Sequence, residues 1–596
     1  MIDFEKIYDF LDRDISPNIN FSKVIRIFRG DVKQFFILVK HFYFRLFLND
    51  IVSFEEQMKE KVIGILALLA IFSAHLSHVI LWKYWLVADK GISWVDKCYL
   101  ISFFMIVMGF ITVLEWDVIF PDSRDFSNLM PLPIKLRTLF SAKFTSLCLF
   151  VGLFALGMNS LSTLVFWYYL PQWHSTSLIY GLRFIFAHLT SVFAANFFIF
   201  FVSVFLIGSL MTLFGYKIFS RISIYLRAVL MIVFVFLLFL FITAPTYVSQ
   251  FFSSFIALKE SNSLFLYLFP PMWFVGLYET LLGNRDPLFS ALSNYSLLAI
   301  ITPAIAFFIA AFFGYRRYLK KIHEVRAKSV RLFKIKTTLI GIFDSIFLSN
   351  PVQRAVFYFF GRTIRRSIFH KMRLITYMAI SSGMVLILLT TLIDDYNNFF
   401  LINRTLLSVP LILTFFLLVG MRSIVNIPVS LEANWIFRLT QRRDKRHYFS
   451  GLKKGVFFYT LNPLFAVLFV IYLFLWGGET AFLHCLYGLV VSVFLMEVLF
   501  QNYHKIPFAC SYLPGKAKMH IFWIVYLFSF LTFVLFFSST ERKLLLAPSR
   551  FLIFYGIIFS LFLLLRIYQN YFLYKRYEIM YEEKLEPAMV TIVPYD

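Results

Sequence analysis

Long apolar runs recur along the whole chain, and they constrain its fold more than any other feature. A helix needs roughly 20 predominantly apolar residues to cross the hydrocarbon core of a bilayer. Only 15% of the 596 residues are charged, whereas an average soluble domain has about 25%. The runs lie near 62–86, 98–120, 144–170, 184–214, 224–243, 294–314, 374–393, 401–421, 456–476, 481–501, 520–538 and 550–573. We therefore predict an all-α polytopic membrane protein with about twelve transmembrane helices, which excludes an ordinary soluble enzyme.

Lysine and arginine are concentrated on one side of the predicted membrane. With the N-terminus placed in the cytoplasm, 47 of the 57 Lys and Arg residues fall in cytoplasmic segments. Basic loops are retained on that side of the membrane, so we expect both termini to be cytoplasmic. The formal net charge of +24 then faces anionic lipid. We expect the lipid bilayer as a partner, and no nucleic acid.

The runs form two groups of six, and each group follows a basic amphipathic stretch. The apolar stripe of the first stretch consists of Phe21, Val24, Phe28, Val32, Phe35 and Val39. That of the second consists of Val352, Val356, Phe360, Ile364 and Ile368. Such spacing is typical of an interfacial helix, although a basic juxtamembrane linker is the alternative. Because six is an even number, residues 1–320 and 321–596 are expected to be two parallel six-helix halves, each preceded by an amphipathic helix.

The loops that follow the second run of each half are alike. Leu139-Phe-Ser-Ala-Lys143 at the end of the first loop matches Tyr448-Phe-Ser-Gly-Leu-Lys453 at the end of the second. The candidate site residues of the first loop are Asp125, Leu132, Pro133, Lys135 and Arg137. Those of the second are Glu432, Asn434, Trp435, Phe437, Arg442 and Arg443. Exposed aromatic anchors are typical of protein interfaces, but Trp435 and Phe437 are equally compatible with packing against their own bundle or the lipid interface.

The longest segment on the non-cytoplasmic side, residues 244–293, is apolar yet interrupted by prolines. Pro270 and Pro271 break a helix, and Trp273 and Glu279 follow them. An extra membrane pass here would reverse every later loop. We therefore predict a re-entrant or interfacial outer hairpin.

Ionisable residues within the runs are few, and each is costly in a bilayer. Glu115 and Glu497 are expected to pair with basic residues such as Lys143 or Lys505, and a proton relay is the alternative. The histidines lack the spacing of a metal site, so no metal is expected. No catalytic arrangement is recognisable, and the four cysteines suggest neither disulfides nor zinc.

One segment carries a family resemblance. Phe120-Pro121 through Asp125, Leu132-Pro133-Ile134 and Leu139-Phe-Ser-Ala-Lys143 resemble the ATPase-contacting loop of type-2 permeases of bacterial ABC exporters. The six-span unit with its interfacial helix and its outer segment is similar to that family too. The resemblance implies a permease subunit in the bacterial inner membrane that exports a lipidic or amphipathic substrate. Residues 121–143 and 428–454 would be its coupling elements, and the outer hairpin would help to close the exit.

The energy source is expected to lie in another chain. A phosphate-binding loop ends in Gly-Lys-Ser/Thr, whereas Gly515-Lys516 is followed by Ala517. The resemblance therefore implies ABC ATPase partners, two for the two halves, which carry the ATP and Mg, and a permease that is not itself an enzyme. The alternative function is an ion-coupled secondary transporter with parallel six-helix repeats. A lipid-modifying membrane enzyme is a third class, for which the sequence offers no compact polar cluster.

Overall fold

The chain is described by a computed structural model that covers most of its residues. The described residues are 22–47, 55–85, 91–115, 129, 131–132, 134–170, 178–243, 245–322, 343–348, 350–390, 392, 401–429, 431, 434–439, 445–510, 519–547, 549–573 and 579–582. Within them every regular element is a helix, apart from an isolated bridge between Lys505 and Met580. Eleven of these helical segments are long and apolar enough to cross a membrane. The predicted all-α polytopic class is confirmed.

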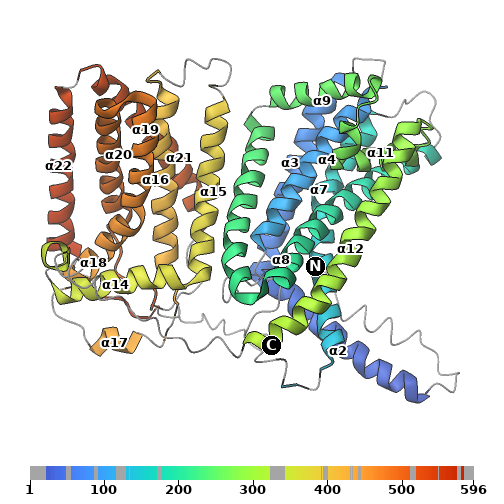
Figure 1. The fold of residues 1–596 in the computed structure, drawn as a ribbon, viewed down its shortest axis with the longest axis horizontal. Helices are drawn as coiled ribbons and strands as arrows, with labels where there is room; N and C mark the ends of the chain where they lie inside the picture. Colours follow the sequence, from blue (N-terminus) through green and yellow to red (C-terminus); the bar gives the residue numbers. More distant parts are fainter. Residues whose placement is uncertain are drawn as a thin grey trace, which may run out of the picture. The chain divides into compact units, whose positions relative to one another are not determined.

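The helices gather into two compact units, Met1–Lys328 and Ser329–Asp596, and each unit is a bundle of helices (Figure 1). We refer to them as unit 1 and unit 2. The division falls after Lys328, whereas the sequence suggested a boundary after residue 320.

Unit 1 is built from long helices and a set of shorter ones. The elements are α2 (Ser22–Phe47), α3 (Glu55–Leu81), η1 (Trp82–Trp85), α4 (Ser93–Leu114), α7 (Leu136–Tyr169), α8 (Leu178–Thr243), α9 (Pro245–Glu260), α10 (Phe265–Leu268), α11 (Pro270–Leu282) and α12 (Pro287–Ile322). In Figure 1, α9 lies across the ends of the long helices.

The helix α8 has 66 residues and contains two membrane passes. A straight helix of that length would measure about 100 Å at 1.5 Å per residue, far more than the roughly 30 Å of a hydrocarbon core. Its first arm runs antiparallel to α7, because Phe201 stacks on Phe144 while His188 contacts Phe166. The sequence predicted a loop at 215–227, but the reversal occurs with the backbone still helical.

The second arm of α8 runs antiparallel to α4. Arg227 donates a hydrogen bond to the carbonyl oxygen of Leu114, and Phe241 lies 4.8 Å from Tyr99, measured between ring centroids. The beginning of α4 therefore lies beside the end of α8. The predicted outer hairpin (α9 to α11) joins this end of the bundle.

The first amphipathic helix, α2, packs along the beginning of α7. Its buried side chains form one cluster with Leu139 and Ala142 of α7. The cluster residues from α2 are Leu38, Val39, Phe42 and Tyr43. The buried face thus extends further along the chain than the predicted stripe, which ended at Val39.

Unit 2 has the same kind of architecture. Its elements are α14 (Pro351–Arg366), α15 (Ile368–Thr390), α16 (Arg404–Val425), α17 (Asn434–Leu439), α18 (Arg446–Val456), η5 (Phe457–Leu461), α19 (Asn462–Trp476), α20 (Gly478–Leu499), α21 (Met519–Leu545), α22 (Arg550–Tyr568) and η6 (Gln569–Leu573). The segment Arg446–Trp476 is a single candidate span that includes α18, η5 and α19. The helix α21 covers the expected run 520–538, which is outside the eleven candidates.

The second amphipathic helix, α14, lies across the ends of the long helices of unit 2 (Figure 1). The side chain of Asn350 caps its first turn by accepting a hydrogen bond from the amide of Val352. Val356 and Phe360 of the predicted stripe are buried in the main core. The stripe was expected to continue to Ile368, but Ser367 takes an extended conformation, which ends α14. Ile368 begins α15 and is exposed.

The repeated motif of the two halves makes the same contact in both units. Ala142 is fully buried against α2. Its counterpart, Gly451 of α18, faces α14 so closely that an added Cβ would lie 2.6 Å from the carbonyl oxygen of Gln353. A small residue at this position lets the amphipathic helix cross close to the spanning helix.

We predict that Gly451→Ala destabilises unit 2, because its Cβ would meet backbone that cannot move away independently. Overpacking of this kind costs about 1–3 kcal/mol. Gly556→Ala in α22 is the matched control, since no atom lies within 4 Å of its added Cβ and Ala favours a helix over Gly. Thermal unfolding of the purified protein in detergent should show a lower midpoint for G451A alone. Equal midpoints for both variants would contradict the close contact.

Candidate functional site

The predicted coupling residues fall into two groups. Asp125, Pro133, Glu432, Arg442 and Arg443 lie outside the described residues. The other coupling residues are Leu132, Lys135, Arg137, Asn434, Trp435 and Phe437.

In unit 1 the predicted coupling loop leads directly into α7. Leu129 and Ile134 pack against the cluster formed by α2 and α7. Leu132, between them, is 49% exposed, and Lys135 is the exposed residue that precedes α7. Arg137 follows in the first turn of α7. The loop is therefore fixed on both sides of an outward-facing leucine.

In unit 2 one face of α17 is anchored to the protein. Asn434 is buried, and its side-chain amide donates a 2.8 Å hydrogen bond to the carbonyl oxygen of Tyr581. The ring of Phe437 packs against Phe359 of α14 at 5.2 Å between centroids. Arg438 forms a 2.7 Å ion pair with Glu582. Residues three apart share a helix face, so Asn434 and Phe437 attach the same side of α17.

The opposite face of α17 is exposed. Trp435 is 58% exposed and Leu439 is 76% exposed, and these residues are four apart and so share a face. Val429 and Leu431 on the preceding segment are also exposed. We call these four residues the α17 surface. In Figure 1, α17 lies beyond α14, away from the long helices of its unit.

The segment before α17 is held by hydrogen bonds to the loop after α20. The amide of Phe508 donates to the carbonyl of Val425 at 3.1 Å, and the amide of Val429 donates to the carbonyl of Phe508 at 2.8 Å. His370 of α15 also contacts the carbonyl of Ile427 at 3.0 Å. These bonds fix the position at which the chain leaves α16, and therefore where α17 is presented.

Tyr581, like Glu582, joins α17 to the C-terminal segment. Burial and the neighbouring Tyr448 raise the pKa of Tyr581 to about 12. Its hydroxyl therefore remains protonated at neutral pH and can donate to the carbonyl oxygen of Phe437 at 3.4 Å. The C-terminal segment is in turn held by the 2.8 Å bond from the amide of Met580 to the carbonyl of His504.

The predicted outer hairpin contains α11, which begins with Pro270 and Pro271 in its first turn. Proline is favourable there because the amides of the first turn have no acceptor within the helix, so the N–H that proline lacks is not missed. The indole nitrogen of Trp273 donates a 2.7 Å hydrogen bond to the carbonyl of Tyr267, which fixes the turn between α10 and α11. Gly276 packs so closely on α12 that an added Cβ would lie 2.4 Å from Leu292.

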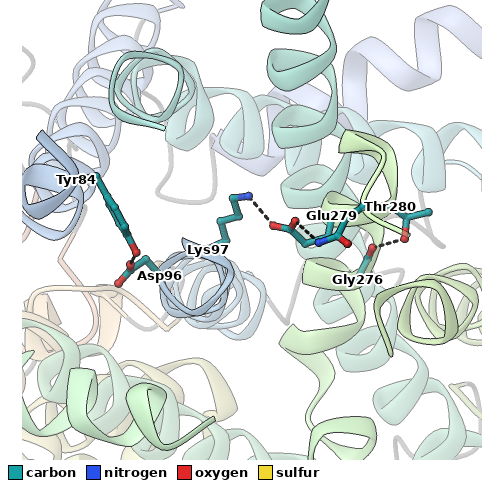
Figure 2. A network of polar contacts seen from close by, with 7 residues as sticks. Tyr84, Asp96, Lys97, Gly276, Glu279 and Thr280 are labelled. Atoms are coloured by element: carbon teal, nitrogen blue, oxygen red, sulfur yellow. Dashed lines mark hydrogen bonds and ion pairs between the residues drawn. The ribbon is translucent and has the colours of Figure 1, made fainter. Parts of the chain in front are cut away.

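Glu279 of the outer hairpin forms a buried ion pair with Lys97 of α4. The Lys97 ammonium and Glu279 Oε1 are 2.6 Å apart, and the two side chains are 4% and 11% exposed. Figure 2 shows the pair together with neighbouring polar contacts. Lys97 also lies 4.4 Å from the centroid of the Tyr278 ring, and Asn284 donates to Glu279 Oε2 at 3.3 Å. The pair thus connects α11 to α4.

Asp96, the neighbour of Lys97, binds a different part of the unit. Its carboxylate accepts a hydrogen bond from Tyr84 of η1 (Figure 2) and pairs with Lys83 at 2.9 Å. Two consecutive residues at the beginning of α4 therefore hold η1 on one side and α11 on the other.

Sequence reasoning missed several of these partners. It identified Glu279 but not Lys97, and the two are 182 positions apart in the chain. It also expected Glu497 to pair with Lys143 or Lys505, whereas Glu497 pairs with Lys453 of α18. Lys97 and Lys453 each lie just before an apolar run, which was the available signal, but this position does not indicate which helices are neighbours.

A comparison with known protein families, curated proteins and solved structures finds no match for this chain.

We predict that Lys97→Met destabilises unit 1 by about 3–5 kcal/mol, because it leaves the Glu279 carboxylate buried without its counter-charge. The double variant K97M/E279Q should recover part of this loss. Lys83→Met is the control, since the Lys83 side chain is 56% exposed and its partner Asp96 would keep the hydrogen bond from Tyr84, so a smaller loss is expected. Thermal unfolding measures all three. A K97M midpoint equal to that of K83M would show that the ion pair is unimportant.

Proposed function

We propose that this chain is the membrane-spanning permease of an ABC-type exporter, and that it moves a lipidic or amphipathic substrate. Two helical units with many membrane-crossing helices are the architecture such a subunit requires. In this proposal the ends of the units that carry α2, α14 and α17 face the cytoplasm of a bacterium, together with both termini.

The α17 surface is the observation that carries the proposal. Trp435 and Leu439 remain exposed on a helix whose other face is fixed by Asn434 and Phe437. Tryptophan is among the residues that contribute most to protein interfaces. A firmly anchored helix that presents an apolar face suits the transmission of a push from a docked ATPase.

The loop before α7 supports a second contact of the same kind. Leu132 is exposed between Leu129 and Ile134, which are packed on unit 1. One exposed anchor in each unit fits two ATPase subunits, one for each unit. Those subunits would supply ATP and Mg, because the sequence has no phosphate-binding loop of its own.

We expect Trp435→Ala combined with Leu439→Ala to abolish co-purification of the ATPase from the native host in mild detergent. Leu546→Ala is the control, since Leu546 is 83% exposed and lies after α21, away from α17. Both variants should retain the thermal unfolding midpoint of the unmodified chain. The proposal fails if an ATPase binds W435A/L439A as well as it binds L546A, or if the unmodified chain recovers no ATPase.

A second candidate function is an ion-coupled secondary transporter, which a buried polar cluster in unit 2 favours. Lys453 contacts both Glu497 and Gln569, the latter at 2.8 Å. Gln569 Nε2 also lies 3.4 Å from Glu497 Oε2. Such clusters inside membrane domains often mark ion pathways. Here, however, the cation of Lys453 already balances the carboxylate, so a structural role is the simpler interpretation.

Glu497→Gln separates these two functions. In the exporter, we expect E497Q to lower the unfolding temperature and to leave ATPase co-purification intact. Proteoliposomes that contain only this chain should show no proton or sodium flux in response to an imposed gradient. A flux that E497Q abolishes would instead establish the secondary transporter. The flux is measured with an ion-sensitive dye trapped inside the vesicles.

A further inference from the structure

A second buried pair in unit 2 is unexplained by packing or by the proposed function. His484 of α20 and Glu541 of α21 are each 1% exposed, and His484 Nδ1 lies 2.5 Å from Glu541 Oε1. Nitrogen and oxygen lone pairs repel each other at this distance, so a proton must lie between the two atoms. The pair lies near the ends of α20 and α21 that are remote from α14.

Each partner of this pair retains a polar atom without a hydrogen bond among the described residues. These atoms are His484 Nε2 and Glu541 Oε2. The indole nitrogen of Trp476 and the hydroxyl of Tyr555 are also without partners. Buried polar atoms are normally satisfied, so four unsatisfied atoms around one ion pair distinguish this place from an ordinary structural contact.

The groups that surround the pair are aromatic or neutral on most sides. The rings of Tyr472 and Trp476 from α19 lie 4.3 Å and 5.3 Å from the imidazole of His484, measured between centroids. Cys485 and Tyr487 are on α20, and Tyr555 is on α22.

Arg404, a cation near this part of α21, forms its hydrogen bonds with other groups than the pair. Arg404 of α16 donates to the hydroxyl of Ser538 at 3.4 Å and to the carbonyl of Leu535 at 3.2 Å. The next basic residues on α21, Arg542 and Lys543, are in its last turn. The protonation state of His484 and Glu541 therefore sets the local charge.

Two protonation states of the pair differ strongly in cost. In the deprotonated state, a neutral imidazole faces a carboxylate, and the pair carries a net charge of −1. In the protonated state, the pair holds one more proton and is neutral overall, either as imidazolium with carboxylate or as imidazole with carboxylic acid. An uncompensated charge in an apolar interior is expensive, so the buried arrangement requires the bound proton.

We propose that His484 and Glu541 form a proton-binding site, and that release of its proton accompanies separation of α20 from α21. Both side chains are sealed from water, so the proton can leave only when the two helices part. Water then reaches the carboxylate and stabilises its negative charge. The proposal does not depend on an ATPase partner, because it concerns only the state of unit 2.

Trp476 provides a local reporter of this site, since an imidazole in contact with an indole changes its fluorescence when a proton is gained or lost. The signal of Trp476 is obtained by subtracting the spectrum of W476F from that of the unmodified chain, at each pH. We expect one step with a slope of one proton. It should be absent from both H484Q and E541Q.

His188→Gln is the matched control for a buried histidine. His188 is 2% exposed and contacts the hydroxyl of Ser162 at 3.3 Å rather than a carboxylate. H188Q should retain the Trp476 step. The proposal is overturned if the unmodified chain shows no step over the pH range in which its circular dichroism remains native, or if the step survives in H484Q and E541Q.

Cys485 tests helix separation in a chain that keeps both partners. The residue is 7% exposed and adjacent to His484. With Cys98, Cys148 and Cys510 replaced by Ala, its reaction rate with a small water-soluble maleimide is measured below and above the step. The ratio of the rate above the step to the rate below it is compared with the same ratio for E541Q, which corrects for the change in the reactivity of the thiol itself. We expect this ratio to be at least tenfold greater when Glu541 is present, and equal ratios in the two chains would overturn the coupling.

Discussion

A charged side chain in a membrane interior must find its counter-charge within the protein, and this requirement organises both units. Lys97 finds Glu279 in unit 1, and Lys453 finds Glu497 in unit 2. Each pair joins elements that are distant in the chain. The ion pairs therefore define which helices are neighbours, whereas the apolar surfaces around them are compatible with many arrangements. Breaking such a pair is costly because both side chains are buried, which leaves the remaining charge without a partner.

The sequence predicted the elements well and their contacts poorly, for a physical reason. A membrane pass requires only length and apolar composition, so almost every expected run coincides with a helix. The sequence predicted the reversal at 215–227 but placed a loop there, because the polar residues indicate the membrane surface without revealing whether the backbone stays helical. The pairing of Lys97 with Glu279 depends on the packing of α4 against α11, which no local pattern encodes.

The candidate coupling site shows what helical periodicity adds to composition. The sequence grouped Trp435 and Phe437 as one aromatic cluster with two alternative roles. Residues two apart on a helix point about 200° away from each other, so the two side chains cannot share a surface once α17 is helical. Phe437 packs on α14, whereas Trp435 is exposed. Phe437 therefore packs against its own bundle, whereas a role for Trp435 in a protein interface stays a prediction.

The buried pairs differ in one property that bears on function. Glu279, the partner of Lys97, also accepts a hydrogen bond from Asn284, which suits a permanent connection between helices. By contrast, His484 Nε2 and Glu541 Oε2 have no hydrogen-bond partner among the described residues, so this pair is less stabilised. A protein that needed only rigidity at this position would be served better by lysine or by an apolar contact, which favours a responsive role for the histidine.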